Sequence, residues 1–228
     1  HHMHEVSQQA ERFHVERFAA ADAVEVSNMQ INLPDGKPLL ENISFTLQPG
    51  HNVLIKGVSG SGKSTLLRAI SGIWPFVDGK IFLPERDKLM FIPQKPYLPL
   101  GTLRSALNYP GNKPIDDTEL IYLMDLCRIS YLKDKLDLEA DWSHVLSVGE
   151  QQRLAFVRAH IQQPQWLFLD EATSALDEET EATMYSLLQE RLPQTTVVSV
   201  GHRSTLNKYH ELVLRLNKLT HQVTLEKL

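Results

Sequence analysis

Apolar positions change their spacing along the chain, and each change predicts a different element. From Ala23 to Leu33 they follow the spacing of a β-strand, and a second strand is predicted over residues 43–47, after the turn at 34–36. Three apolar residues at 53–55 then lead into a glycine-rich stretch and a helix-forming segment over residues 64–70. The first third of the chain therefore predicts two or three antiparallel strands, followed by a strand, a loop and a helix.

The middle of the chain has a different pattern from its two ends. Five prolines between residues 93 and 114 open a segment whose later apolar residues, from Leu120 to Cys127, recur at helical spacing. We expect an α/β fold with an N-terminal antiparallel β subdomain and an inserted α-helical subdomain, about residues 95–163. After this insertion the predicted elements are a strand at 166–169, a helix at 178–191, a strand at 195–200, and a closing hairpin of residues 211–216 and 222–225.

The first 22 residues differ from the rest of the chain. His1-His2-Met3-His4 resembles the remnant of a purification tag, so its histidines are not candidates for a metal site. Residues 5–22 are polar and helix-compatible, and we interpret them as a linker from a transmembrane domain that this sequence lacks. Residues 1–22 are therefore assigned to tag and linker, and residues 23–228 to the folded domain.

The composition excludes several classes of protein. The 228 residues are 42% apolar and 22% charged, as in a soluble globular chain, and the net charge of −5 comes without a basic run that could bind nucleic acid. The longest apolar run, residues 120–124, is far shorter than the roughly 18 residues of a membrane helix. Cys127 is the single cysteine and cannot form an internal disulfide, which is typical of a protein from a reducing compartment.

The glycine-rich stretch carries a phosphate-binding motif. Residues 57–64 match the pattern G-x-x-x-x-G-K-[ST] in full, between the predicted strand and the predicted helix. The backbone N–H groups of such a loop turn towards phosphates, and the helix presents its positive N-terminus. Lys63 would reach the β- and γ-phosphates, and the Ser64 hydroxyl would ligate Mg²⁺, so ATP and Mg²⁺ are the expected ligands. The predicted nucleotide contacts are Gly57, Ser59, Gly60, Ser61, Gly62, Lys63, Ser64 and Thr65.

An acidic pair follows the predicted strand at 166–169. Asp170 would hold Mg²⁺ through water, and Glu171 would orient or deprotonate the attacking water. Adjacent carboxylates at a strand end repel one another unless a cation or a catalytic role keeps them there. The alternative interpretation is that Glu171 caps the following helix.

Four further motifs make the chain resemble the nucleotide-binding domain of an ATP-binding cassette (ABC) transporter. With the phosphate-binding loop they occur in the family's order, over nearly everything from about Val24 to Leu225, and the resemblance implies a P-loop NTPase core of the ABC ATPase type. The matching segments are a signature motif at Leu146-Ser147-Val148-Gly149-Glu150, a D-loop at Ser174-Ala175-Leu176-Asp177, a Q-loop at Gln94 and a switch histidine at His202.

The resemblance also implies roles and partners. Gln94 would contact Mg²⁺ or the attacking water, and His202 would hydrogen-bond the γ-phosphate. Two copies would pair head to tail, so that ATP on one P-loop also meets Ser147, Gly149 and Asp177 of the other copy. Fused transmembrane helices, absent from this sequence, would convert ATP hydrolysis into transport at the cytoplasmic face of a membrane.

Two motifs depart from the family pattern. In the signature, Val148 replaces a glycine and Glu150 replaces a glutamine. Ser147 and Glu150 also have the spacing of a capping box, and without that bond the carboxylate would weaken the binding of ATP. Leu33 stands where an aromatic residue usually stacks on adenine, so we expect looser or less base-selective binding, unless an aromatic from elsewhere takes over.

Several segments indicate which branch of the family the chain resembles. Segments 73–75, 93–104, 141–142 and 199–206 resemble the peroxisomal fatty-acyl-CoA half-transporters of subfamily D and their bacterial exporter-like relatives. Two alternatives stay open: a soluble ABC protein without a membrane partner, and a cassette that binds ATP with little turnover. The single cassette without extended heptads disfavours the first, and Glu171 with His202 disfavours the second.

Overall fold

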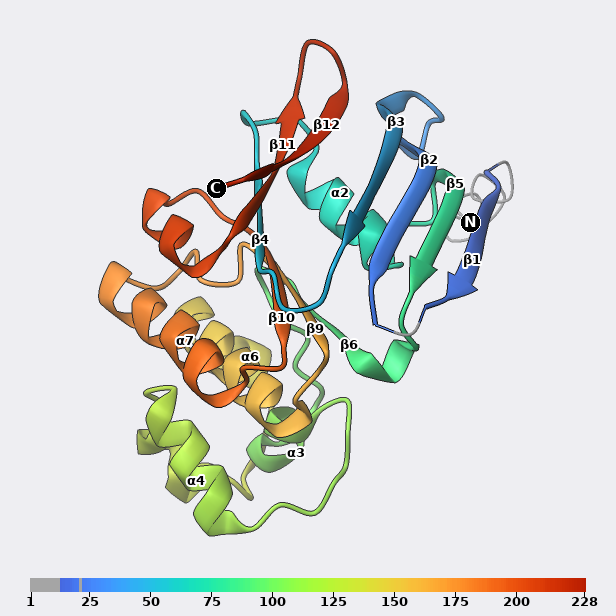
Figure 1. Ribbon diagram of the computed structural model, residues 1–228. Helices are drawn as coiled ribbons and strands as arrows, with labels where there is room; N and C mark the ends of the chain where they lie inside the picture. The colour runs from blue at the N-terminus through green and yellow to red at the C-terminus, as the bar shows by residue number, and fades with distance from the viewer. Residues whose placement is uncertain (1–12, 21) are drawn as a thin grey trace.

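The computed structural model describes residues 13–20 and 22–228, which form two larger sheets beside a helical region (Figure 1). The strands are β1 (Val15–Ala19), β2 (Val24–Asn32), β3 (Pro38–Leu47), β4 (Val53–Lys56), β5 (Val77–Leu83), β6 (Leu89–Ile92), β7 (Gly101–Thr102), β8 (Glu139–Ala140), β9 (Trp166–Asp170), β10 (Thr196–Val200), β11 (Leu212–Asn217) and β12 (Gln222–Lys227). The α-helices are α2 (Lys63–Ile70), α3 (Leu103–Asn108), α4 (Asp117–Leu126), α5 (Trp142–Val145), α6 (Val148–Gln162) and α7 (Glu178–Arg191). Short 3₁₀ helices are η1 (Arg86–Lys88), η2 (Ser130–Lys135) and η3 (Ser204–Tyr209). Within this part of the chain, no helix combines the length and the apolar character that crossing a bilayer requires.

The larger sheet has six strands in the order β12-β11-β4-β10-β9-β6. Five of them run parallel, and β12 pairs antiparallel with β11 as the predicted closing hairpin. Every residue of β9 is buried: Leu167 and Leu169 join one apolar cluster, and Trp166 and Phe168 join the other. Burial of both faces explains why the sequence of this strand is continuously apolar rather than alternating.

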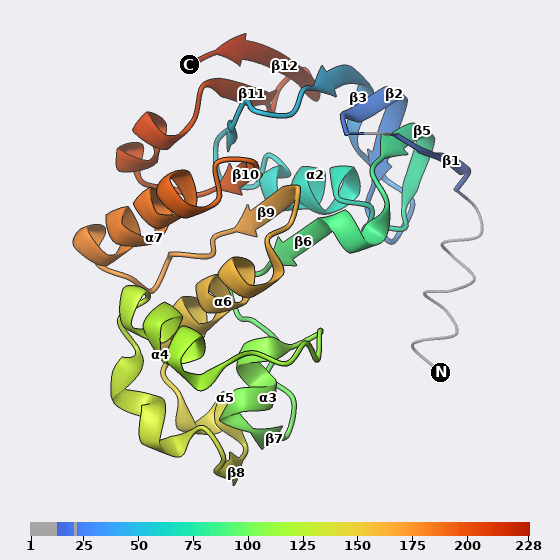
Figure 2. The ribbon, with the colours of Figure 1, turned by 60° about the horizontal axis from the view of Figure 1, so that its bottom comes forward.

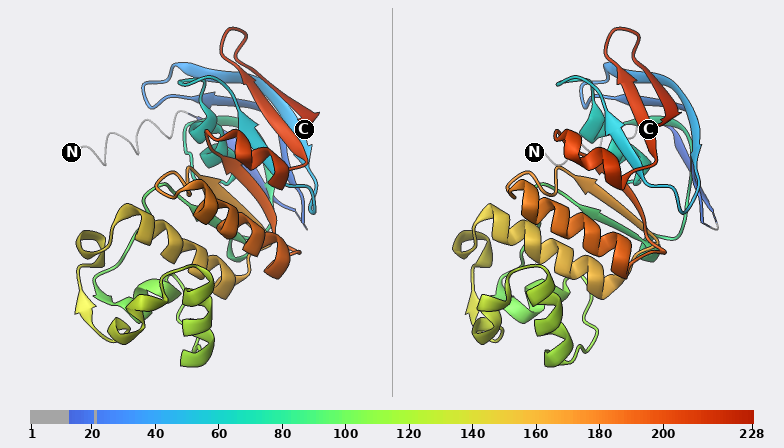
Figure 3. Two further views of the ribbon diagram at one scale, coloured as in Figure 1. Left: turned by 90° about the vertical axis from the view of Figure 1, so that its left-hand side faces the viewer. Right: turned by 60° about the vertical axis from the view of Figure 1, so that its left-hand side comes forward.

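Helices cover both faces of this sheet. Helices α6 and α7 lie side by side against one face, as both views of Figure 3 show. Helix α2 lies on the other face, where its buried residues Leu66, Leu67 and Ile70 share an apolar cluster with strands of both sheets. The strand before the glycine-rich loop and the helix after it are therefore both anchored in the core, which holds the loop between two rigid elements.

The smaller sheet has the order β1-β5-β2-β3. Its strands β2 and β3 pair antiparallel as predicted, whereas β5, which pairs antiparallel with β2, was not predicted from the sequence. Strand β1 pairs in parallel with β5, with Val15 opposite Gly79 and Ala19 opposite Leu83. The assignment of residues 5–22 as a linker stays a prediction, but their expected helical character is wrong for the segment Val15–Ala19, which is a strand. Four of its five side chains are exposed, so it has almost no core pattern, and its backbone is paired because β5 offers a free edge. The predicted tag remnant and the linker up to residue 12 lie outside the described residues.

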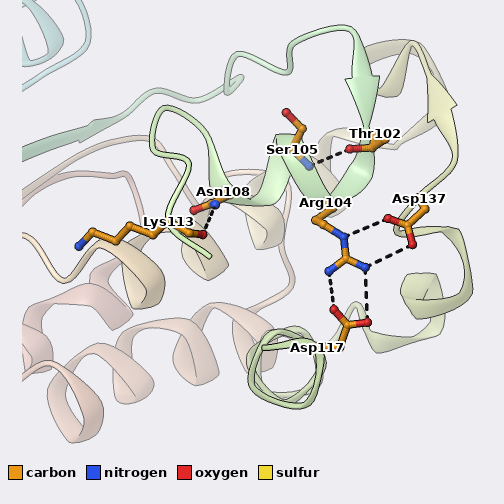
Figure 4. A network of polar contacts seen from close by, with 7 residues as sticks. All are labelled: Thr102, Arg104, Ser105, Asn108, Lys113, Asp117 and Asp137. Atoms are coloured by element: carbon orange, nitrogen blue, oxygen red, sulfur yellow. Dashed lines mark hydrogen bonds and ion pairs between the residues drawn. The ribbon is translucent and has the colours of Figure 1, made fainter. Parts of the chain in front are cut away.

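Helices α3, α4 and α5 gather on one side of the molecule with the first turns of α6 (Figure 2). This region corresponds to the helical subdomain expected from the sequence, but it is not purely helical, because β7 and β8 pair antiparallel within it. Arg104 joins its parts: the guanidinium lies 2.5 Å from Asp117 Oδ1 and 3.0 Å from Asp137 Oδ1 (Figure 4). These contacts link α3 to the start of α4 and to the segment before β8, and they lower the pKa of Asp137 below its usual range.

Two buried histidines should make the stability of the fold depend on pH. His160 is 3% exposed, and neither of its ring nitrogens has a hydrogen-bond partner within the described part of the chain. Burial lowers the pKa of His160 to about 4, with a further contribution from Arg191, and burial also lowers the pKa of His210 to about 4. Both side chains are therefore neutral in the folded protein at pH values at which an unfolded chain binds a proton.

We expect the free energy of unfolding to fall as the pH drops from about 6.5 towards 4, by about 1.4 kcal/mol per pH unit for each histidine. The sign follows from the lowered pKa, because the unfolded state binds more protons in this window. Denaturant unfolding of wild type and of His160→Leu at pH 7, 5.5 and 4.5 measures it, and the slope of the variant should be smaller by about 1.4 kcal/mol per pH unit, the contribution of one histidine. His14→Gln, on an exposed side chain, is the control and should keep the full slope. An unchanged slope in His160→Leu would contradict the assignment.

Candidate active site

The predicted site residues meet at one edge of the larger sheet. Four parallel strands end there: β4 leads into the P-loop, β9 into Asp170 and Glu171, β10 into His202 and β6 into Gln94. The register places Val200 opposite both Ile55 and Asp170, so these strand ends are level. Ligands of open α/β sheets bind at the carboxyl ends of the strands, and this edge is therefore where a nucleotide would lie.

The P-loop has the geometry of a phosphate cradle. Gly60 and Gly62 have φ angles of 78° and 100°, which a residue with a side chain rarely adopts, so glycine is required at both turns. Lys63 Nζ donates to the carbonyl of Gly57 over 2.8 Å, which curls the lysine over the loop. The hydroxyl of Ser61 is buried and has no partner among the described residues, so it is free to bind a phosphate oxygen.

Two of the three predicted metal ligands are joined directly. Ser64 Oγ donates to Asp170 Oδ1 over 2.7 Å, and Arg68 holds the second carboxylate oxygen at 3.2 Å. A hydroxyl and a carboxylate oxygen at the end of a phosphate loop form the donor set that Mg²⁺ prefers, so these residues fit the ion. Gln94 lies elsewhere in the site, where its Nε2 donates to Ser174 Oγ over 3.2 Å. Apart from the position of Arg68 on α2, nothing in the sequence indicates this contact.

Glu171 and His202 form an acid–base pair. His202 Nε2 lies 2.8 Å from Glu171 Oε1, and the glutamate side chain is 16% exposed whereas that of the histidine is 69% exposed. Partial burial raises the pKa of Glu171, and the charge of Asp170 adds to the rise, while His202 and Lys63 oppose it. A carboxylate with a raised pKa is a better proton acceptor near neutral pH.

The backbone at Glu171 is also unusual. Its φ angle of 54° lies in the left-handed region, which is uncommon for a residue with a side chain and is typical of functional sites. The alternative role of capping the following helix is not found: helix α7 begins after Asp177, whose carboxylate accepts from the N–H of Thr180 over 2.7 Å. Glu171 therefore does not cap a helix, and its side chain lies in the site beside His202.

The signature motif begins helix α6 with the predicted capping box. The N–H of Ser147 donates to Glu150 Oε1 over 2.9 Å, and the N–H of Glu150 donates to Ser147 Oγ over 3.1 Å. Glu150 Oε2 also accepts from the hydroxyl of Tyr131 over 2.5 Å. Partial burial raises the pKa of Glu150, but these hydrogen bonds together lower it by more, so the net shift is down. The predicted capping box is confirmed, and Tyr131 is a further partner of Glu150 that the sequence did not indicate.

The remaining predicted contacts lie apart from the P-loop of their own chain. Ser147 and Gly149 start α6 near α5, at the opposite side of the molecule from α2 (Figure 2). Gly149 packs on the D-loop, because a Cβ added there would lie 3.3 Å from the carbonyl oxygen of Ala175. Asp177 is exposed at the start of α7. The P-loop and the signature of one chain therefore do not form one site.

A second leucine of the first hairpin lies beside the P-loop. Leu33 lies in the turn after β2, where its backbone is paired with Gly36 and Lys37. From the same hairpin, Leu39 of β3 reaches the P-loop, since a Cβ added at Gly62 would lie 3.0 Å from Leu39 Cδ2. The role of Leu33 stays a prediction, and Leu39 is an apolar neighbour of the loop that the sequence comparison with an aromatic pattern did not identify.

Gln152 is the residue of the site for which the sequence analysis assigned no role. It is fully buried on α6, and its side-chain amide contacts Gln94, Glu171, Ser174 and Ala175. In the sequence it stands between Gln151 and Arg153, directly after the signature motif, and its residue type there gives no signal for these contacts.

Comparison with known proteins places this geometry in a family. The family model described as "ABC transporter" matches residues 40–174, which is more than half of the chain and includes the P-loop, the signature and both site carboxylates. The chain belongs to the ABC transporter family. It has the fold of an ABC ATPase domain, and as such it binds and hydrolyses ATP.

Similar proteins extend this assignment. An uncharacterized ABC transporter ATP-binding protein of Haemophilus influenzae is 47% identical over 83% of this chain and 32% of its own length. ABC transporter D family member 3 of Dictyostelium discoideum is 38% identical over 86% of this chain and 28% of its own length. Human ATP-binding cassette sub-family D member 3 is 36% identical over 87% of this chain and 31% of its own length. The expected similarity to subfamily D and to bacterial ABC proteins is thereby confirmed.

A solved structure agrees with the fold. The structure described as a bacterial Atm1-family ABC exporter with ATP bound superimposes with a TM-score of 0.76 at 26% identity, over 90% of this chain and 38% of that chain. The chain spans about a third of the length of the curated relatives it matches. The Haemophilus and Dictyostelium relatives are described as ABC transporter proteins and the solved structure as an ABC exporter, which does not favour the alternative of a soluble ABC protein.

Proposed function

We propose that this ABC domain hydrolyses ATP-Mg²⁺ with Glu171 as the residue that activates water, and that it drives transport by a transmembrane domain. The observation that carries the proposal is the pair of Glu171 and His202 at 2.8 Å, next to the bond between Ser64 and Asp170. The first pair can handle a proton and align water, and the second can hold a metal ion at the phosphates.

The hydrolytic step follows from these positions. The P-loop amides, Ser61 and Lys63 bind the phosphates, and Ser64 with Asp170 would hold Mg²⁺, which supplies positive charge to the transferring phosphoryl group. Glu171 accepts a proton from the water that attacks the γ-phosphorus, while the bond to the β-phosphate oxygen breaks and ADP leaves. His202 orients Glu171 and hydrogen-bonds the γ-phosphate, and Gln94 contributes from the neighbouring strand end.

A second copy of the domain is part of the proposal. Ser147 and Gly149 present the start of a capped helix, whose positive end suits a phosphate, yet it lies far from the P-loop of the same chain. A head-to-tail pair would bring this helix end to ATP on the partner's P-loop, with Asp177 beside it. Each site would then be completed by the other copy.

The transmembrane partner has a candidate docking surface next to Gln94. A groove there is lined by Pro93, Pro96, Tyr97, Tyr109 and Arg158. Tyr97 is 62% exposed and nearby Leu100 is 78% exposed, and large exposed apolar side chains of this kind mark interaction sites. Binding at this groove would place the domain at the cytoplasmic face of the membrane and would link transport to Gln94.

Light scattering after size exclusion tests the sandwich. Glu171→Gln is expected to form a dimer with ATP and Mg²⁺ and to be monomeric without them, because ATP that is not hydrolysed keeps both interfaces occupied. Wild type is expected to stay largely monomeric, because hydrolysis releases the dimer.

A signature variant identifies the interface. Ser147→Arg in the Glu171→Gln background should stay monomeric with ATP while its P-loop still binds nucleotide, because Ser147 is exposed at the helix end. Ser105→Arg, on an exposed position of α3, is the matched control and should still dimerise. A dimer that survives Ser147→Arg would overturn the head-to-tail arrangement.

A further inference from the structure

We propose that Gln152 is a positioning residue that fixes Glu171 and Gln94 relative to the signature helix, and this rests on the hydrolytic roles proposed above. Gln152 lies on α6 and its exposed fraction is 0%. Its Nε2 donates to the carbonyl of Gln94 over 2.9 Å and to Ser174 Oγ over 3.1 Å, and it lies 3.4 Å from the carbonyl oxygen of Glu171. One amide thus contacts segments that follow two different strands.

The orientation of this amide is determined by its neighbours. The N–H of Ala175 can only donate, and it points to Oε1 of Gln152 over 2.9 Å. The carbonyl oxygens of Gln94 and Glu171 can only accept, so the NH₂ group must face them. An acid or a hydrocarbon of the same length cannot satisfy both sides, which makes the glutamine specific at this position.

Ser174 completes the junction. Its hydroxyl accepts from Nε2 of both Gln94 and Gln152, so the Q-loop side chain is held by the same residue that contacts the signature helix. Gln152 lies three residues after Gly149 on one helix, and Gly149 packs on the carbonyl of Ala175. A shift of the helix end that meets a partner's ATP would therefore be carried to Glu171 of its own chain.

The neighbouring Gln151 provides a matched control. It is the same residue type on the same helix and is 1% exposed, but its Nε2 donates to the carbonyls of Ser143 and Leu146, outside the strand-end segments. Replacing either glutamine with leucine removes two buried hydrogen bonds or more. Only the change at 152 removes contacts to the residues proposed to act on water.

Two measurements on the purified chain test the proposal. Hydrogen exchange should be at least tenfold faster at the amide of Ala175 in Gln152→Leu than in wild type, and unchanged there in Gln151→Leu. At saturating ATP, kcat of Gln152→Leu should fall at least tenfold with KM within about threefold, whereas Gln151→Leu should keep kcat within about threefold. Ser174→Ala, an exposed residue whose change leaves the core intact, should lower kcat to an intermediate value.

The outcomes separate this proposal from the proposed function. Unchanged exchange at Ala175, or equal losses of kcat in both leucine variants, would overturn the role of Gln152. If Gln152→Leu does not fold, Ser174→Ala decides, because wild-type kcat in that variant would also overturn it. A failure of the hydrolytic assignment would show instead as a Glu171→Gln variant with wild-type turnover, while the exchange experiment would still report on the junction.

Discussion

Glu171→Gln is expected to lower kcat for ATP hydrolysis by about 10²- to 10⁴-fold, the range of a lost general base. The amide keeps the shape of the side chain and can still bond to His202, but it cannot accept the proton of the attacking water. The affinity of the monomeric domain for ATP should change by less than about threefold, because the P-loop supplies the phosphate contacts. Phosphate release at saturating ATP and calorimetric titration measure the two quantities.

The pH profile adds a second signature to this prediction. Burial and the charge of Asp170 raise the pKa of Glu171, so wild-type kcat should fall on the acid side, with a midpoint above the ordinary range of a glutamate. The sign follows from the role, since the protonated carboxyl cannot act as a base. Glu178→Gln, an exposed glutamate in the first turn of α7, is the control and should keep wild-type turnover. Turnover of Glu171→Gln within threefold of wild type would show that another group activates the water.

Lys63→Met is expected to weaken ATP binding by roughly 10- to 100-fold, the effect of a lost hydrogen bond to a charged group. The half-buried lysine is anchored on the carbonyl of Gly57 over 2.8 Å, in a cleft that also contains His202. Methionine has a similar length and preserves the apolar part of the side chain, so the change isolates the ammonium group. Calorimetric titration with ATP and Mg²⁺ measures the loss.

A control for net charge belongs with this experiment. Lys80→Met removes a positive charge from an exposed position of β5, away from the loop, and should leave the affinity within about twofold. If both lysine variants lose the same affinity, the effect comes from the overall charge of the protein. A Lys63→Met variant that binds ATP as wild type does would mean that the nucleotide is held elsewhere.

The fold was predictable where burial leaves a repeating pattern. The apolar run of β9 and the alternation of β2 reflect the faces they bury, and both were predicted. Strand β1 was not predicted, because an exposed edge strand buries almost nothing and is held by backbone bonds that any sequence can make. Strands β7 and β8 were missed for a similar reason, since two residues each are too short for a pattern.

The parts of the site that lie on one continuous segment were determined by the sequence alone. The P-loop, the pair of Asp170 and Glu171, and the capping box of Ser147 with Glu150 are local, because backbone geometry and near neighbours create them. Their residue types and spacing are enough to specify their chemistry.

Only the tertiary structure decided which distant side chains meet. The pairing of Glu171 with His202, the contact of Leu39 with the P-loop and the junction at Gln152 join segments far apart in the sequence. They depend on the register of the parallel strands and on the packing of α6 against the sheet, which are set by burial over the whole core. The sequence alone shows where each local motif lies, whereas the distances between residues of different motifs are set only when the core assembles.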